Sequence, residues 1–352
     1  MEKGTMKISR ICEKILAAAD LKNMAGLAVG IMVGGETCTG ARGYRNIENG
    51  ELMNAGTIFH CASISKTFTS TAVMKLVEEG KLGLNDKLAD VLPYLSIADK
   101  RCQKIEINHM LSHISGLQDA GELGWKAGLT GADALKNYAF ADEVTGRPML
   151  GEPGNCTPVY SDMAYDLLGL VIQEVSGQPF ETYIKENFFD PAGMKDTTFL
   201  TFERTGGSLG LEDIDKAKIA MPHVKDADGK IALESMFPYT RQHAPSSTLT
   251  SNVSDLLKWG RYNLDKKAVS ADSYMKMWTE RVDIPDKFAM MGMGWFIRHE
   301  NGHMFVGHEG GDVGFRTSFW ICPECDAALV ILANTTEAPI EPLTESFCMD
   351  IE

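Results

Sequence analysis

Segments with strand character lie at both ends of this 352-residue chain. Near the N-terminus, two apolar or alternating runs at 25–33 and 36–44 are separated by Gly34-Gly35, which predicts a β-hairpin. Short turns separate four further runs near the C-terminus, so we expect these to be antiparallel strands: 294–298, 303–307, 316–321 and 328–332. The pattern predicts one antiparallel sheet built from the two chain ends.

The middle of the chain has mostly helical periodicity, which is strongest over 162–175. The expected helices of this region are 65–80, 131–140, 161–176, 179–189, 252–264 and 270–280. The Gly- and Asp-rich stretch 201–246 lacks this period, and we interpret it as a long irregular insertion.

These patterns predict an α+β fold: an antiparallel sheet flanked by terminal helices near 7–22 and 339–350, with a mostly helical inserted subdomain. Residues 1–352 would form a single unit. Its sheet subdomain would comprise 1–60 and 281–352, and its helical subdomain 61–280. We expect a cleft between the two subdomains.

Composition narrows the classes of function. The chain carries a net charge of −14 and is 44% hydrophobic. Such an acidic surface repels phosphate backbones and anionic lipids, so we expect neither nucleic acid nor membrane as a partner. No run of 18 apolar residues occurs, and the N-terminal segment lacks the apolar core of a signal peptide. We therefore expect a cytoplasmic location.

Eight cysteines are scattered along the chain, and most are expected to be buried thiols. Cys322 and Cys325 form a CxxC between two apolar runs, but a second CxxC for a zinc site is missing. A hairpin turn that carries two cysteines is the favoured interpretation, with metal or redox use as the alternative. We expect no metal and no cofactor.

Ser63 and Lys66 are three residues apart at the start of an expected helix. This spacing stacks the two side chains on one helix face, where an amine can activate a serine hydroxyl. Backbone N–H groups at a helix start also stabilise an oxyanion. Chance alone supplies about one such pair in a chain of this composition. Ser273 and Lys276 form a second one, which we interpret as part of an ordinary amphipathic helix.

Two later segments supply what an acyl-transfer site also needs. Tyr160-Ser161-Asp162 precedes the strongest helix, where the Tyr hydroxyl can project into a cleft; alternatively Tyr160 is packed, with Ser161 or Asp162 as the N-cap. The Gly-rich run around His308, Gly310 and Gly311 separates two expected strands. It permits close approach of a ligand to the backbone, or is simply a turn that contains a histidine.

Together these three segments resemble the serine β-lactamase and penicillin-binding-protein superfamily. The chain is most similar to its class C β-lactamase-like group, which includes D-aminopeptidases, D-alanyl-D-alanine carboxypeptidases and family VIII esterases. The pattern of that group is Ser-x-x-Lys, Tyr-x-Asn and Lys-Thr-Gly or His-x-Gly. The connecting segments 79–86, 110–117 and 191–194 are similar as well, so the resemblance covers nearly the whole chain.

The resemblance implies a role for each matching residue. Ser63 would attack a carbonyl and form an acyl-enzyme, while Lys66 and Tyr160 would share the acid–base role. The N–H groups of Ser63 and Gly311 would form the oxyanion hole. His308 would lie on the substrate-binding strand, near the carboxylate or leaving group of the substrate.

Two positions depart from the group. Asp162 replaces the usual Asn, and an ionised carboxylate cannot donate hydrogen bonds. It would hold Lys66 protonated, select cationic substrates, or merely cap the helix. His308 stands where many relatives have Lys, and a neutral His binds a carboxylate poorly near pH 7. The resemblance then favours esterase, amidase or D-peptidase activity over efficient β-lactam hydrolysis.

The first hypothesis is therefore a serine hydrolase for a small ester, amide or D-amino-acid peptide, with a small-molecule or short-peptide substrate as its partner. A non-catalytic binding or sensing module on the same fold and a genuine β-lactamase are the alternatives. A metallohydrolase built on His109 and His113 lacks a complete ligand set, and we expect a structural role for both.

Overall fold

The structure is a computed structural model, which describes residues 2–119, 133–199, 218–234, 241–285 and 287–351. A nine-stranded sheet dominates it, in the order β3-β2-β1-β14-β13-β12-β11-β10-β9. The strands from the N-terminal part are β1 (Gly26–Val33), β2 (Glu36–Asn46) and β3 (Glu51–Leu52). Those from the C-terminal part are β9 (Val282–Asp283), β10 (Met290–Met291), β11 (Phe296–Glu300), β12 (His303–Asp312), β13 (Phe315–Cys322) and β14 (Ala327–Ala333).

The two chain ends meet where β1 pairs with β14, in a register that places Val29 opposite Ile331. Every strand pair of this sheet is antiparallel. Both strands are buried on both faces, which explains why their sequences are continuously apolar. The expected antiparallel sheet and the α+β class are thus confirmed. The subdomain boundaries at residues 60 and 281 stay a prediction.

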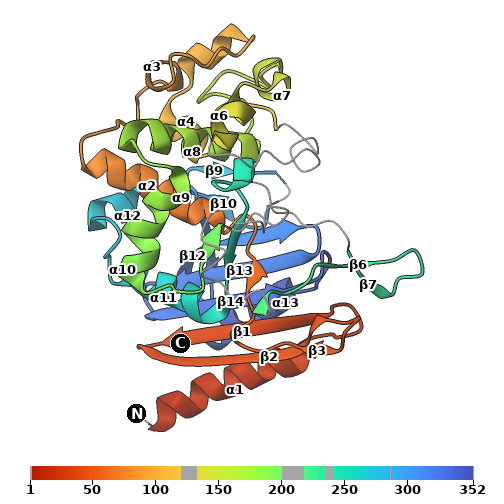
Figure 1. The fold of residues 1–352 in the computed structure, drawn as a ribbon. Coiled ribbons are helices and arrows are strands. Elements are labelled where there is room, and N and C mark those ends of the chain that lie inside the picture. Colours follow the sequence, from red (N-terminus) through yellow and green to blue (C-terminus); the bar gives the residue numbers. More distant parts are fainter. Residues whose placement is uncertain (1, 120–132, 200–217, 235–240, 286, 352) are drawn as a thin grey trace.

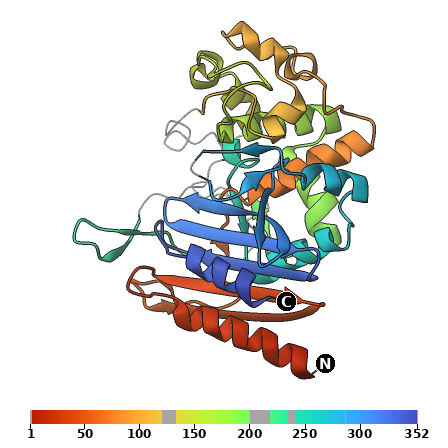
Figure 2. The same ribbon diagram turned by 180° about the vertical axis from the view of Figure 1, so that it is seen from behind.

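Helices cover both faces of the sheet. On one face lie α1 (Glu2–Ala18) and α13 (Glu341–Asp350), which contact each other. In Figure 2 the dark-blue α13 lies in front of the C-terminal strands and the red α1 lies below the N-terminal strands. On the other face α11 (Val253–Leu264) packs on β1, β13 and β14. Successive side chains of β1 and β14 point to opposite faces of the sheet. Val29 and Ile331 belong to the apolar core on the α1 face, and Ala28 and Leu332 to the core on the α11 face.

The helical region stacks above the α11 face (Figure 1). Its centre is α2 (Ser65–Glu78), which is buried on nearly all sides and packs on α8 (Asp162–Ser176). The remaining helical segments are α3 (Leu88–Val91), η1 (Lys100–Lys104), α4 (Ile107–Leu111), α6 (Ala134–Ala139), α7 (Asp142–Thr145), α9 (Phe180–Ile184), η2 (Lys185–Phe189), α10 (Asp190–Ala192), η5 (Arg241–His243) and α12 (Ala271–Met277). Among the described residues, no helix is both long and apolar enough to cross a membrane.

Several strands differ from the sequence prediction. Part of the stretch 201–246 lies outside the described residues, but β6 (His223–Lys225) and β7 (Ile231–Leu233) form a regular hairpin within it. A small sheet of β4 (Phe59–His60), β8 (Leu249–Ser251) and β5 (Thr198–Phe199) was also not expected. These strands have only two or three residues, too few to establish a period of two.

The Gly-rich run 307–312 was expected between two strands, and this expectation was wrong. The run is the second half of β12, with His308 opposite Phe319 and Gly310 opposite Thr317. Pairing with β13 overrides the poor strand propensity of glycine.

Candidate active site

Ser63 lies in a tight turn that leads from β4 into α2. The helix begins at Ser65, as expected, and the Ser63 carbonyl already accepts a hydrogen bond from the Lys66 amide at 3.0 Å. Ala62, directly before the serine, has a φ of +47°, a left-handed conformation that costs energy for a residue with a Cβ. Contacts with the surrounding residues must therefore stabilise this turn, and the turn then fixes the position of Ser63.

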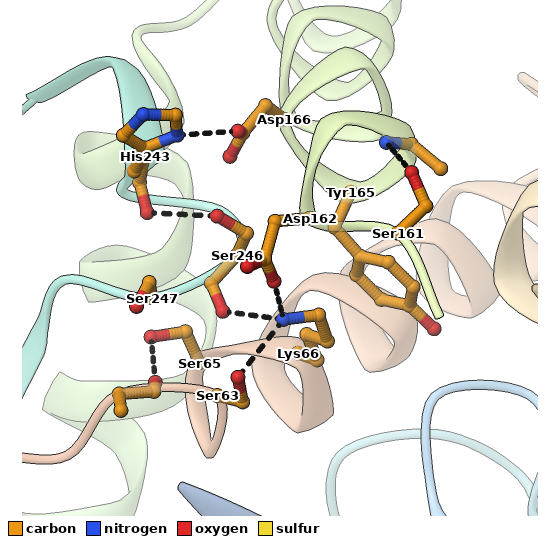
Figure 3. A network of polar contacts seen from close by, with 12 residues as sticks. Ser63, Ser65, Lys66, Ser161, Asp162, Tyr165, Asp166, His243, Ser246 and Ser247 are labelled. Carbon is orange, nitrogen blue, oxygen red and sulfur yellow. Dashed lines mark hydrogen bonds and ion pairs between the residues drawn. The ribbon is translucent and has the colours of Figure 1, made fainter. Parts of the chain in front are cut away.

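Lys66 has no exposed side-chain surface, and its amine is fully hydrogen-bonded (Figure 3). Its Nζ donates to Ser63 Oγ at 3.1 Å, to the Ser246 carbonyl at 2.9 Å and to Asp162 Oδ1. Burial alone would lower the pKa of Lys66, but the Asp162 carboxylate and the Tyr160 phenol outweigh burial and raise it above its usual value. The serine thus faces an ammonium group in this structure.

Asp162 is not the helix cap. Ser161 caps α8, because its Oγ accepts a hydrogen bond from the Ala164 amide at 3.1 Å. The Asp162 side chain, 35% exposed, extends to Lys66. Asp119 lies behind this helix start and accepts bonds from Ser161 Oγ at 3.0 Å and the Met163 amide at 2.9 Å. Burial and the nearby Asp162 raise the pKa of Asp119 to about 6.

Tyr160 faces the same amine with its ring. Lys66 Nζ lies 4.7 Å from the ring centroid, and burial raises the pKa of the phenol to about 12. The His113 ring stacks on Tyr160 at 4.5 Å, and its Nδ1 accepts a hydrogen bond from the Ser161 amide at 3.0 Å. His113 therefore has a structural role in positioning the Tyr160 segment. Lys287, whose Nζ lies 4.7 Å from the ring centroid, was not predicted.

Strand β12 passes directly beside the serine turn. A Cβ on Gly310 would lie 2.4 Å from the Cys61 carbonyl and 2.2 Å from Thr317 Oγ1, so only glycine fits. Thr317 ties the two segments together by donating to that same carbonyl at 3.0 Å. Gly311, the next residue, faces the other side of the sheet, where a Cβ would meet the Arg316 guanidinium.

His308 is on the Gly310 side of β12 and is completely buried. Its ring lies 4.6 Å from that of Phe296 and 6.1 Å from that of Tyr160, and its Nδ1 is 2.6 Å from the Glu309 carbonyl oxygen. Burial and the Lys66 charge hold the pKa of His308 well below its usual range. His308 is therefore neutral near pH 7 and suited to hydrogen bonding rather than to an ion pair.

A buried loop after η5 completes the cage around Lys66. Ser246 contributes the carbonyl that Lys66 binds, and its Oγ donates to the His243 carbonyl at 3.3 Å. His243 Nδ1 lies 2.6 Å from Oδ2 of the buried Asp166 on α8 (Figure 3). The sequence gives no indication of this contact, because a backbone carbonyl leaves no side-chain signal. By contrast, the Oγ of Ser273 donates to the Glu78 carboxylate at 2.5 Å and not to a lysine amine.

The fold and this serine–lysine–tyrosine cluster define the class of protein. A sheet from both chain ends, with the serine at the start of a buried helix and a glycine-containing strand beside it, is the arrangement of serine acyl-transfer proteins that use an Ser-x-x-Lys pair. The family model described as Beta-lactamase matches residues 14–344. The chain belongs to the Beta-lactamase family, and the resemblance to the serine β-lactamase and penicillin-binding-protein superfamily is confirmed.

Individual relatives are distant. "Penicillin-binding protein 4" of Amycolatopsis lactamdurans is 25% identical over 327 residues, which are 89% of this chain and 81% of the relative. "Protein flp" of Staphylococcus aureus (strain MW2) is also 25% identical, over 86% of this chain, but the match spans only 58% of that longer protein. The crystal structure of D-amino acid amidase from Ochrobactrum anthropi SV3 superposes with a TM-score of 0.81 at 19% identity, covering 96% of this chain and 97% of the amidase.

Proposed function

We propose that the protein is a serine hydrolase that acts through a covalent acyl-enzyme on a small ester, amide or D-amino-acid peptide. The contact of Ser63 Oγ with Lys66 Nζ at 3.1 Å, inside a fully hydrogen-bonded cage, is the observation that carries this proposal. Burying a charged lysine costs on the order of several kcal/mol. A protein that only binds a ligand gains nothing from placing this charge against a serine hydroxyl, whereas a serine hydrolase uses the pair.

In the proposed reaction, Ser63 Oγ attacks the substrate carbonyl and passes its proton to the acid–base pair. The C–N or C–O bond of the substrate then breaks, and the amine or alcohol that leaves takes up this proton; water later hydrolyses the acyl-enzyme along the reverse path. Lys66 and Tyr160 are the titratable groups beside Ser63, and both remain candidates for the base. The N–H groups of Ser63 and Gly311 would bind the oxyanion.

The substrate class follows from charge. Asp162 and Asp119 place carboxylates near Lys66, and the neutral His308 offers no cation for a substrate carboxylate. This balance favours neutral esters, or amides and peptides with a free amine, and leaves Lys287, beside Tyr160, as the cation that would bind a substrate carboxylate. The D-amino acid amidase that shares the fold supports the amide choice. A cytoplasmic location and the absence of nucleic-acid and membrane partners stay predictions from the composition.

The test is intact-mass analysis after incubation with a fluorophosphonate, a β-lactam or a p-nitrophenyl ester. We expect the wild type to gain one adduct and Ser63→Ala to gain none. Ser273→Ala is the matched control, because it removes the hydroxyl of the second Ser-x-x-Lys pair, and it should label like the wild type.

Labelling that persists in Ser63→Ala would refute the assignment of the nucleophile. A wild type that no probe labels would favour the non-catalytic binding module instead. Rapid turnover of nitrocefin without esterase activity would identify a genuine β-lactamase and refute the substrate class.

A further inference from the structure

Three metal-binding side chains converge at the end of the sheet, outside the candidate active site. His303 begins β12, Cys322 ends β13, and Cys325 lies in the turn before β14. One ligand atom from each residue lies within 4.8 Å of the other two. The CxxC therefore does not stand alone, because the neighbouring strand supplies the histidine that the sequence did not reveal.

We propose that His303, Cys322 and Cys325 bind a zinc ion. Zinc prefers thiolate and imidazole ligands in tetrahedral sites, and two cysteines separated by two residues are a common half of such a site. With Zn–S bonds of about 2.3 Å, tetrahedral sulfur atoms are about 3.8 Å apart, so the observed cluster needs only a small contraction to enclose the ion.

Glu324, inside the CxxC, lies next to two of the three ligands and would become the fourth ligand by a movement of its side chain. Its Oε2 lies 3.8 Å from His303 Nδ1 and 3.9 Å from Cys322 Sγ. The same oxygen accepts a hydrogen bond from the Met304 amide at 2.8 Å, which holds the carboxylate over the cluster. A carboxylate hydrogen-bonded in this way is a normal zinc ligand. Its side chain is 52% exposed, so the ion can enter from solvent.

The position of the cluster indicates a structural ion. His303 and His308 are five residues apart on β12, which places His303 roughly 16 Å along the strand from His308. The ion would join the start of β12 to the turn between β13 and β14. It would thereby fasten the strand that carries Gly310 without touching substrate.

The direct test is the metal content of protein purified under reducing conditions without chelator. We expect about one zinc ion per chain by mass spectrometry of the metal. His303→Ala and Cys325→Ser should lose it, and both positions are partly exposed, so the variants should fold. Cys102→Ser, at another partly exposed cysteine, is the matched control and should keep the ion.

Two further measurements do not depend on activity. Cobalt(II) added to metal-free wild type should give the d–d bands of a tetrahedral site with a thiolate-to-metal band, and Cys325→Ser should not. Zinc should raise the thermal midpoint of the metal-free wild type but not that of Cys325→Ser.

Equal zinc content in the wild type and Cys325→Ser would overturn the proposal, as would loss of zinc from Cys102→Ser. A Cys322–Cys325 disulfide in protein prepared with reductant would also overturn it. None of these results bears on Ser63 labelling, so the proposed function is tested separately.

Discussion

The Lys66 amine donates a hydrogen bond to the Asp162 carboxylate, although the two residues are 96 positions apart in sequence. Relatives with the Tyr-x-Asn pattern place a neutral amide at this position. A carboxylate instead stabilises the ammonium form of Lys66, which is the wrong form for a general base. In the proposed reaction, either the proton leaves Lys66 during substrate binding, or Tyr160 acts as the base.

Replacing Asp162 with Asn should lower the pKa of Lys66. The variant lacks the carboxylate charge that raises this pKa, while the burial that lowers it remains. If Lys66 is the base, the rising limb of the pH profile of kcat/KM moves to lower pH, with a gain of about tenfold at pH 7. If the ammonium form is required, the same variant loses activity, and the loss grows with pH.

Asp133→Asn is the matched control, since Asp133 is exposed at the start of α6 and is not part of the cage, and its profile should equal that of the wild type. A pH profile of Asp162→Asn that superimposes on the wild type would show that the ion pair does not govern the reaction.

Gly310→Ala should impair the site through sterics alone. The new Cβ would overlap the Cys61 carbonyl, so β12 must move away from the serine turn. We expect kcat/KM to fall by about a hundredfold, because small displacements of catalytic groups have such effects. Circular dichroism should show that the fold is retained.

Gly311→Ala gives the comparison on the same strand. Its Cβ meets only the end of the flexible Arg316 side chain, so its loss in kcat/KM should be much smaller. Equal losses for the two variants would contradict the proposed close contact between β12 and the serine turn.

Lys287→Gln should change substrate preference rather than chemistry. Its amine lies 4.7 Å from the Tyr160 ring centroid, and Lys287 is an exposed residue. We expect KM for a carboxylate-bearing ester to rise about tenfold, with no change for a matched neutral ester. Lys276→Gln, at an exposed lysine on α12 that is not part of the cluster, serves as the control. A similar KM change for both esters would argue against a charge-selective role.

Asp119→Asn should stabilise the protein at alkaline pH. The native pKa of about 6 exceeds the ordinary value, so the native state prefers the protonated acid. Its contribution to stability is fully present below pH 4 and is lost as the pH rises through 6. At pH 8 the amide should increase the free energy of unfolding by ~2 kcal/mol, while its Oδ1 keeps the bonds from Ser161 and Met163.

Urea unfolding at pH 4 and pH 8 checks this expectation. The difference in free energy between the variant and the wild type should be near zero at pH 4. A variant that is less stable than the wild type at pH 8 would disprove the assignment of a destabilising buried carboxylate.

Local sequence patterns were enough to predict the main helices and strands and the Ser63–Lys66 pair. The apolar period of α8 and the runs of β1 and β14 are visible in the sequence because each element must bury a defined face. The spacing of Ser63 and Lys66 likewise places both side chains together, even though α2 begins at Ser65. Neighbours within one helix turn need no tertiary information to meet.

Only the tertiary structure showed that Asp162 pairs with Lys66 and how far strand β12 extends. The sequence left open whether Asp162 caps a helix or binds Lys66, and the packing of α8 on α2 settled this. Pairing with β13 made a strand of the Gly-rich run at His308, and folding brought the Ser246 carbonyl to Lys66 and His303 to the CxxC. Such contacts join residues distant in the chain. Their energies depend on burial and charge, which exist only once the elements have packed.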